Sequence, residues 1–168
     1  MTEQQYNWAG NYAYSAARLH YPRTIEQIQE LVSRHSKVRV LGSRHSFNGI
    51  GDTSDDQISL EQLDRVLVLD RERHTVTVDG GMRYGQLCPY LDQEGYALHN
   101  LASLPHISVA GACATATHGS GDQNRSLAGA VAAMEVVTAG GEVAVFSRDP
   151  GFAHDQQRSQ SSDPFQGM

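Results

Sequence analysis

One segment restricts the fold of this chain more than any other, residues 38–49. Its first half is rich in aliphatic residues and ends at Gly42, where a run of small and hydrogen-bonding residues begins. This pattern predicts a strand that ends in a polar turn with His45 at its centre. Backbone N–H groups in such a turn converge on an anion, and an imidazole beside them can act as a base, a ligand or a covalent anchor. The same pattern is also typical of an ordinary surface turn.

A second segment, residues 100–121, consists almost entirely of small or hydroxyl-bearing residues and contains His106 and His118. Small residues allow the backbone to come very close to a flat or phosphorylated ligand. Together the two segments therefore favour a site for a ligand of this kind over a simple surface turn.

The two segments resemble the flavin domain of the vanillyl-alcohol oxidase and p-cresol methylhydroxylase superfamily, and within it the alditol (xylitol) oxidases. The turn of residues 42–48 is similar to the flavin-attachment loop of that family. Residues 102–111 are similar to its loop and short helix around the flavin ring and pyrophosphate. The resemblance covers residues 7–147 and implies bound FAD, held between two small α+β subdomains.

The resemblance also implies roles for individual residues. His45 corresponds to the residue that bonds covalently to the flavin ring, and the candidate catalytic residues are Ser103, near ring and substrate, and Ala102, which influences oxygen access. Arg44 stands where several family members have glycine, so its side chain either pairs with phosphate or crowds the backbone approach. The complete set of candidate cofactor-binding residues is Leu41, Gly42, Ser43, Arg44, His45, Ser46, Ser103, Ser108, Gly111, Ala114, Thr115, His118 and Gly119.

The implied activity is oxidation of a polyol (alditol) hydroxyl by O2, which gives H2O2. The alternatives are an aldonolactone oxidase and a non-catalytic flavin-binding module. The expected small-molecule partners are therefore a polyol or sugar lactone and O2. In the family, the base and the groups that bind the polyol come from a substrate domain, which is missing here, so we expect the chain alone to be inactive.

A chain of 168 residues is long enough for one domain with a real core. We assign residues 1–147 to the FAD-binding domain, incomplete at its C-terminal end, and residues 148–168 to an irregular tail. Residues 154–168 are rich in Gln and Ser and are predicted to be disordered. The chain resembles a truncated or frame-shifted fragment.

Charge and hydropathy exclude several classes of protein. A formal net charge of −6 argues against a nucleic-acid-binding surface. The longest apolar run, residues 127–134, is far shorter than the roughly 18 residues that span a bilayer. The start of the chain has no signal-peptide character, so we expect a cytoplasmic protein. Cys88 and Cys113 have no metal-type spacing and are predicted to be reduced, partly buried thiols.

The periodicity of the sequence predicts an α+β fold with helices packed on small sheets. Helices are expected over residues 24–34, with Thr24 as the cap, and from Tyr84 to Gly95, where Pro89 should kink or shorten the helix. Hairpins are expected over residues 66–78, with His74 exposed at the tip, and 135–146. Short strands are expected at residues 37–41, 58–60 and 96–98.

Two metal-binding hypotheses fail on spacing. The first is a site built from His45, His99, His106 and His118. These histidines include no closely spaced pair of ligands and have no carboxylate partner, so no metal site is predicted. A calcium loop lacks the required glycine and terminal glutamate, so we expect a solvated loop around its three carboxylates, Asp52, Asp55 and Asp56.

A serine hydrolase is also disfavoured. Ser46 and Ser120 each have a histidine nearby, but neither lies in a Gly-X-Ser-X-Gly elbow and no acid partner is evident.

Overall fold

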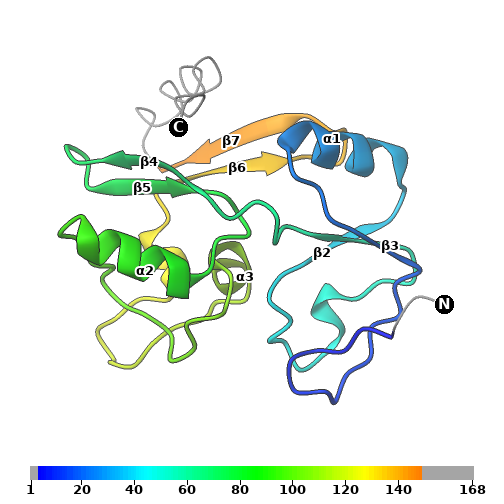
Figure 1. The fold of residues 1–168 in the computed structure, drawn as a ribbon, viewed down its shortest axis with the longest axis horizontal. Coiled ribbons are helices and arrows are strands. Elements are labelled where there is room, and N and C mark those ends of the chain that lie inside the picture. Colours follow the sequence, from blue (N-terminus) through cyan, green and yellow to red (C-terminus); the bar gives the residue numbers. More distant parts are fainter. Residues whose placement is uncertain (1–3, 149–168) are drawn as a thin grey trace.

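The computed structural model describes residues 4–148, which form two lobes side by side (Figure 1). The first lobe contains β1 (Arg18–His20), α1 (Ile25–Arg34), β2 (Val38–Leu41), the 3-10 turn η1 (Gly49–Gly51) and β3 (Asp56–Ser59). The second contains β4 (Val66–Asp70), β5 (Thr75–Val78), α2 (Tyr84–Gln93), α3 (Val109–Ala114), the 3-10 turn η2 (Leu127–Ala130), β6 (Ala133–Val137) and β7 (Val143–Ser147). This mixed arrangement confirms the predicted α+β class.

The first lobe is built on a three-stranded parallel sheet in the order β1-β3-β2. Helix α1 connects β1 to β2, and the Thr24 hydroxyl caps its start by accepting the Gln27 backbone N–H at 3.3 Å. The predicted helix and the strand before His45 are confirmed. The predicted strand at residues 58–60 is displaced, because the central strand β3 begins at Asp56 and is buried along its whole length.

In the second lobe, α2 packs on the β4-β5 hairpin through Leu87 and Leu91, together with Met82 just before the helix. The predicted hairpin is confirmed, and His74 is exposed at its tip. The prediction that Pro89 shortens the helix is wrong, because α2 is unbroken from Tyr84 to Gln93. Burial of leucines on both sides of Pro89 outweighs the single backbone hydrogen bond that proline removes.

The predicted strand at residues 96–98 is also wrong. Gly95 takes a left-handed φ of 80°, and the Tyr96 backbone N–H donates to the Leu91 carbonyl at 2.8 Å. This backbone group therefore completes the end of α2 and does not pair with a strand.

The β6-β7 hairpin is confirmed and reaches across to the first lobe (Figure 1). The Gln29 side-chain amide of α1 donates to the Gly141 carbonyl at 2.7 Å. Gly141 has a φ of 81°, and a Cβ there would lie 3.0 Å from the Gln29 carbonyl oxygen. A glycine is therefore required where the hairpin tip meets α1.

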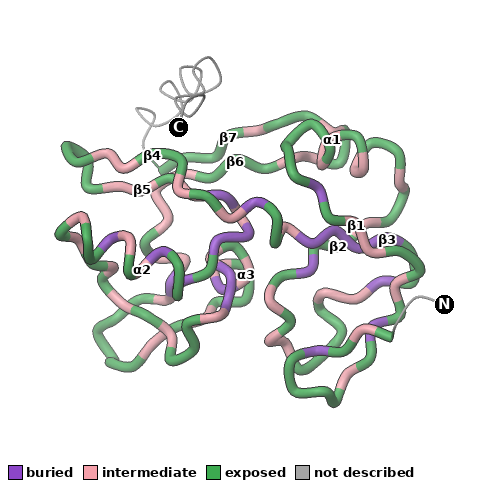
Figure 2. Tube along the Cα trace, viewed as in Figure 1, coloured by how far each residue is buried: buried purple, intermediate pink, exposed green. Residues whose placement is uncertain are grey.

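Buried residues line the middle of each lobe (Figure 2). A cluster of Tyr84, Ile107, Ala112 and Leu127 joins α2, α3 and η2, and Ala102 packs against it. Cys88 and Cys113 are free and half-buried, as predicted, and burial raises the pKa of each thiol.

Within residues 4–148, no helix is long and apolar enough to span a membrane. The predicted disorder of the tail concerns residues outside the described part of the chain. Arg148, its first residue, is described, and its backbone N–H donates to the Ala132 carbonyl at 3.0 Å.

Candidate functional site

The turn after β2 is held in place by the N-terminal segment. The Trp8 backbone N–H donates to the Arg44 carbonyl at 2.8 Å, and the Asn7 side-chain amide donates to the Ser46 carbonyl at 3.1 Å. Arg44 has a φ of 64°, a left-handed conformation that favours glycine. Its guanidinium donates to the Gln5 side chain at 2.8 Å, and phosphate pairing by Arg44 stays a prediction.

The segment that carries His106 is fixed by the start of α2. The Gly85 N–H donates to the Pro105 carbonyl at 2.6 Å, and the Val109 N–H donates to the Met82 carbonyl at 2.8 Å. Because these bonds lie on both sides of His106, its backbone position is set by the second lobe.

The two segments singled out in the sequence meet at two glycines. The Ser108 N–H donates to the Ser43 hydroxyl at 3.2 Å. A Cβ on Gly42 would lie 3.1 Å from the Ser108 hydroxyl, and a Cβ on Gly111 only 2.7 Å from it. The contact from Gly42 to Ser108 crosses from the end of β2 to α3, whereas that from Gly111 lies within the first turn of its own helix, so the close approach of the two segments depends on Gly42. It brings Gly42, Ser43, Ser108 and Gly111 together, as a shared ligand site requires.

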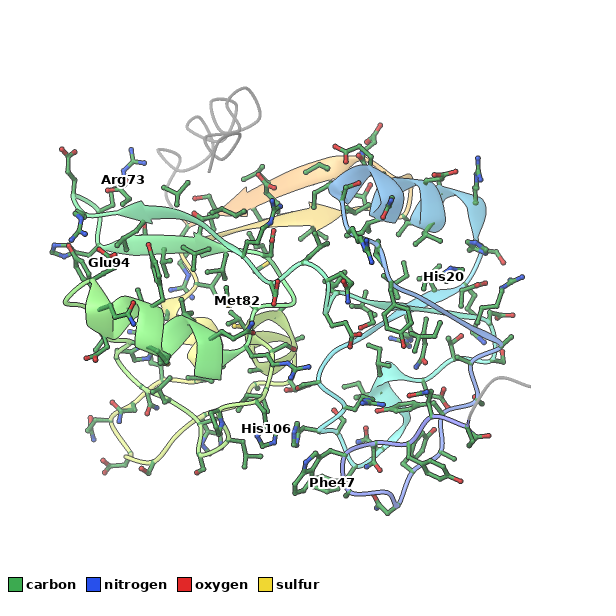
Figure 3. The ribbon with its side chains drawn as sticks, in the orientation of Figure 1. His20, Phe47, Arg73, Met82, Glu94 and His106 are labelled. Atoms are coloured by element: carbon green, nitrogen blue, oxygen red, sulfur yellow. The ribbon has the colours of Figure 1, made fainter. Side chains whose placement is uncertain are left out.

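Three aromatic rings lie next to this contact, and we call them the ring cluster: Trp8, His45 and His106. The centroids of His45 and His106 are 4.4 Å apart, and that of Trp8 is 5.0 Å from His45 and 6.0 Å from His106. Figure 3 shows His106 at the edge of the second lobe that faces the turn after β2. The ring cluster therefore joins both lobes and the N-terminal segment.

The polar atoms of the ring cluster are incompletely satisfied. Among the described residues, three buried side-chain nitrogens have no hydrogen-bond partner: Nε2 of His45, Nε2 of His106 and Nδ2 of Asn100. Burial, and secondly the charge of His106, lower the pKa of His45. His45 is therefore a neutral imidazole at neutral pH, and a buried polar atom without a partner points to a ligand that supplies one.

The surface around the ring cluster suits a flat ligand. Trp8 is 62% exposed although it contacts two other rings, and Phe47, Leu101 and Leu104 are also exposed. Small-ligand sites are typically cavities of roughly 300 to 1,000 Å³. One of ≈ 730 Å³ borders His106, with Glu61, Asp64 and Arg83 in its wall. Exposed apolar rings, unpartnered nitrogens and a polar cavity thus occur together here, as a site for a flat ligand with polar groups requires.

The remaining candidates differ in exposure, and all except Leu41 lie in residues 100–121. The Thr115 hydroxyl donates to the Gly111 carbonyl at 3.0 Å, and a His118 ring nitrogen lies 2.9 Å from the Gly119 carbonyl. A Cβ at Gly119 would overlap the Leu101 carbonyl, so both ends of residues 100–121 come together. Ser103 and Ala114 are exposed, Ala102 is half-buried, and Leu41 is buried at the end of β2. No described contact tests the roles of Ser103 and Ala102.

Sequence reasoning did not assign Trp8 or Asn100 to the site. Trp8 was expected only to pack at the edge of a core, yet it contacts both histidines of the ring cluster. Trp8 is the one tryptophan of the chain and lies in a segment rich in Gly and Asn. This unusual position is the sequence signal that could have assigned it to the site. Asn100 carried no signal of its own.

The prediction of a solvated loop around the three carboxylates is wrong for Asp56, which is 2% exposed and begins β3. Asp55 is exposed, as expected, and Asp52 is half-exposed in the loop. Asp52 accepts the Tyr12 hydroxyl at 3.0 Å and the Ser15 backbone N–H at 2.9 Å. A buried carboxylate such as Asp56 keeps its charge only with donors, and these come from residues distant in the sequence.

Residues 16–147 match the family model described as "FAD binding domain". The chain belongs to this FAD-binding domain family. The match includes both segments of the site, and the ring cluster with its unpartnered nitrogens fits the cofactor that the family binds. The resemblance to flavin oxidases that the sequence indicated is thereby confirmed.

Relatives of known activity match the same part of the chain. It is 45% identical over 138 residues to an alditol oxidase from Streptomyces sp., and 35% identical over 141 residues to an L-gulono-1,4-lactone dehydrogenase from Mycobacterium tuberculosis. These matches cover 80% and 82% of this chain and 33% of each relative. The chain thus spans about a third of the length of the curated relatives it matches.

A solved structure, that of a xylooligosaccharide oxidase from Myceliophthora thermophila C1 in complex with xylobiose, has a similar fold. The TM-score is 0.70 at 24% identity, over 84% of this chain and 32% of that one. At this identity the likeness supports the FAD-binding fold alone.

Proposed function

We propose that this chain is the FAD-binding part of an oxidase that oxidises a polyol hydroxyl with O2 and releases H2O2. One observation carries the proposal. The unpartnered Nε2 atoms of His45 and His106 lie beside the exposed ring of Trp8, where the two lobes meet. The 45% identity to an alditol oxidase supports a polyol as the substrate.

In this proposal the two lobes hold FAD between them. The backbone of Gly42, Ser43 and Gly111 and the Ser108 hydroxyl bind its polar part, and the ring cluster contacts the flavin. When bound, FAD accepts a hydride from the alcohol and passes the electrons to O2. His45 is the covalent attachment residue, because its imidazole is half-buried, its Nε2 has no described hydrogen-bond partner and its lowered pKa favours the neutral, nucleophilic form.

We assign Ser103 to the substrate side of the site. It is exposed in the loop that precedes His106, where its hydroxyl is available to a polyol oxygen. Ala102 lies next to it with its side chain in the core cluster, and we propose that its small size leaves a path for O2. In an assembled enzyme, Ser103→Ala should raise the activation free energy of turnover by about 1 to 3 kcal/mol, which is the value of one hydrogen bond.

The chain of 168 residues alone should bind FAD without oxidising polyols. Its match to the relatives ends at about a third of their length, and we place the base for the alcohol proton in the other two thirds. Without a positioned base and a closed pocket, hydride transfer has no oriented substrate.

Covalent attachment is tested on the 168-residue chain without an activity assay. After incubation with FAD and acid precipitation, the pellet should be yellow, and His45→Ala should lose this colour while His99→Ala keeps it. His99 is a suitable control because it is exposed and lies outside the ring cluster. A yellow His45→Ala pellet would rule out His45 as the attachment residue.

The substrate is tested in a chimera in which residues 16–147 replace the matching third of the Streptomyces alditol oxidase. Peroxide release with xylitol or sorbitol would support the polyol assignment. The alternative, an aldonolactone oxidase, predicts peroxide only when this part is joined to a lactone oxidase, and a non-catalytic module predicts none in either chimera.

A further inference from the structure

A second histidine pair, apart from the ring cluster, lies in the first lobe. His20 is on β1, His35 caps the C-terminal end of α1, and Asp56 begins β3. The His20 Nε2 is 2.7 Å from Asp56 Oδ1, and the His35 Nδ1 is 3.0 Å from Asp56 Oδ2. We call these three residues the His20–His35–Asp56 cluster (Figure 3, His20).

The donor set of this cluster is that of a transition-metal site. Two imidazole nitrogens and a carboxylate oxygen lie within 4.8 Å of one another. Both His–Asp distances are those of hydrogen bonds, so the two imidazoles must turn and move slightly away from the carboxylate to admit a metal ion with bonds of about 2.0 to 2.2 Å. Nitrogen donors favour Zn²⁺ and its neighbours over Mg²⁺ or Ca²⁺.

One cation, the guanidinium of Arg18, already lies against the carboxylate of this cluster. The Arg18 guanidinium donates from Nε to Asp56 Oδ1 at 2.7 Å and from Nη2 to Oδ2 at 2.8 Å. The Asp56 side chain is only 3% exposed, whereas that of Arg18 is 62% exposed. The Arg18 side chain can therefore turn into solvent, and the Asp56 carboxylate then requires another positive partner in its place.

The cluster is also accessible to water and ions. A cavity of ≈ 350 Å³ adjoins it, lined by both histidines together with residues of α1 such as Glu30 and Leu31. Water from this cavity can complete the coordination, since three protein ligands and a water form a common tetrahedral zinc site.

We propose that His20, His35 and Asp56 bind a divalent transition-metal ion, and that Arg18 is the cation that fills the site when no metal is present. On binding, each imidazole turns a lone pair towards the metal and carries its proton on its other nitrogen. Arg18 moves out, and the metal ties β1, the end of α1 and β3 together. The proposal does not depend on FAD, because no residue of the ring cluster takes part.

None of the three residues belongs to the histidine set that the sequence offers as metal ligands, which is His45, His99, His106 and His118. From the sequence, Asp56 is expected in a solvated loop. The three ligands are separated by 15 and 21 positions in the chain, and they come together because β1 and β2, the strands on either side of α1, both pair in parallel with β3.

The experiment titrates Co²⁺ into the full 168-residue chain and follows the visible absorption of bound Co²⁺, with Zn²⁺ as the competitor. The wild type should show one saturable site that Zn²⁺ displaces. His20→Gln and His35→Gln should each weaken binding by more than about tenfold. His99→Gln, at an exposed histidine outside the cluster, should bind as the wild type does.

Arg18→Gln tests the exchange directly, because removal of the competing guanidinium should tighten metal binding. Circular dichroism of each variant shows whether the fold is kept, and the two histidine variants retain the Arg18–Asp56 pair that holds the strands. Binding that is absent, or equal in the wild type and both histidine variants, would overturn the site. Unchanged affinity in Arg18→Gln would overturn the exchange.

Discussion

The two histidine pairs of this molecule have opposite environments. The rings of His20 and His35 are 5.5 Å apart, and each directs a nitrogen at the buried carboxylate of Asp56. The rings of His45 and His106 are 4.4 Å apart, with no carboxylate between them and an unpartnered Nε2 on each. In the first pair, a nitrogen of each ring has a partner within the protein. In the second pair, the Nε2 atoms have a partner only when a ligand supplies one.

The difference shows that one pair stabilises the folded protein and that the other destabilises it. Four donor atoms around Asp56 compensate the desolvation of one carboxylate and connect β1, α1 and β3. In the ring cluster, buried nitrogens without partners cost stability, and such a cost is typical of binding sites. Substitutions in the two pairs should therefore have opposite effects on stability.

The largest effect is expected at Asp56. Asp56→Asn removes the charge that four donor atoms share and should lower the free energy of unfolding by about 3 kcal/mol. Chemical denaturation measures it. Asp55→Asn, at the exposed neighbour, is the matched control and should change stability by less than about 0.5 kcal/mol. Equal effects at the two positions would show that the carboxylate is not the centre of the first lobe.

Low pH should remove the same contribution of the Asp56 carboxylate to stability. Hydrogen bonds from Arg18 and then His20 hold the pKa of Asp56 well below its usual range. The unfolded chain takes up a proton at this group near pH 4, before the folded chain does, so stability falls as the pH decreases below that value. The stability difference between wild type and Asp56→Asn should therefore shrink between about pH 5 and pH 2. A constant difference would contradict this assignment.

A smaller effect, of the opposite sign, is expected in the ring cluster. His106→Phe keeps a ring against Trp8 and His45 and removes a buried nitrogen without a partner. Without FAD, the free energy of unfolding should stay the same or rise by up to about 1 kcal/mol. His106→Ala, which loses the ring contacts, should instead lose about 1 kcal/mol. A loss in His106→Phe as large as in Asp56→Asn would remove the contrast between the pairs.

The smallest effect is a change in the titration of His45. Its pKa lies below the ordinary value of about 6.5, first because of burial and then because of the charge of His106. Proton NMR of the imidazole should show this lower midpoint. In His106→Phe the midpoint should rise without reaching the ordinary value, since burial remains. A midpoint that does not move would leave burial as the sole cause.

The contrast between the pairs also separates what the sequence could and could not predict. Local signals were sufficient for α1, where Thr24 caps the first turn, and for both hairpins, where turn residues separate strand-like runs. The glycines at 42 and 111 could be assigned to one site because their segments resemble a known family. The physical reason for Gly42, the close approach of β2 and α3 at Ser108, required the structure.

Features that depend on distant residues were missed. The burial of Asp56 follows from parallel pairing between β1 and β3, which leaves no periodic trace in a loop rich in aspartate. Trp8 was misplaced because an aromatic residue in a Gly-rich segment packs on a core more often than it borders a ligand. Residues 96–98, directly after α2, were misread as a strand because the backbone bond from Tyr96 to Leu91 is not visible in composition.

The contact between the β6-β7 tip and α1 has a consequence for the order of folding. The hydrogen bond from Gln29 to Gly141 joins residues 112 positions apart, so it closes a very long loop. Long loops are slow to close, whereas each lobe can form from nearer contacts. During synthesis, α1 must wait for almost all of the described chain to leave the ribosome before its partner exists. The contact between this hairpin tip and α1 should therefore be among the last to form.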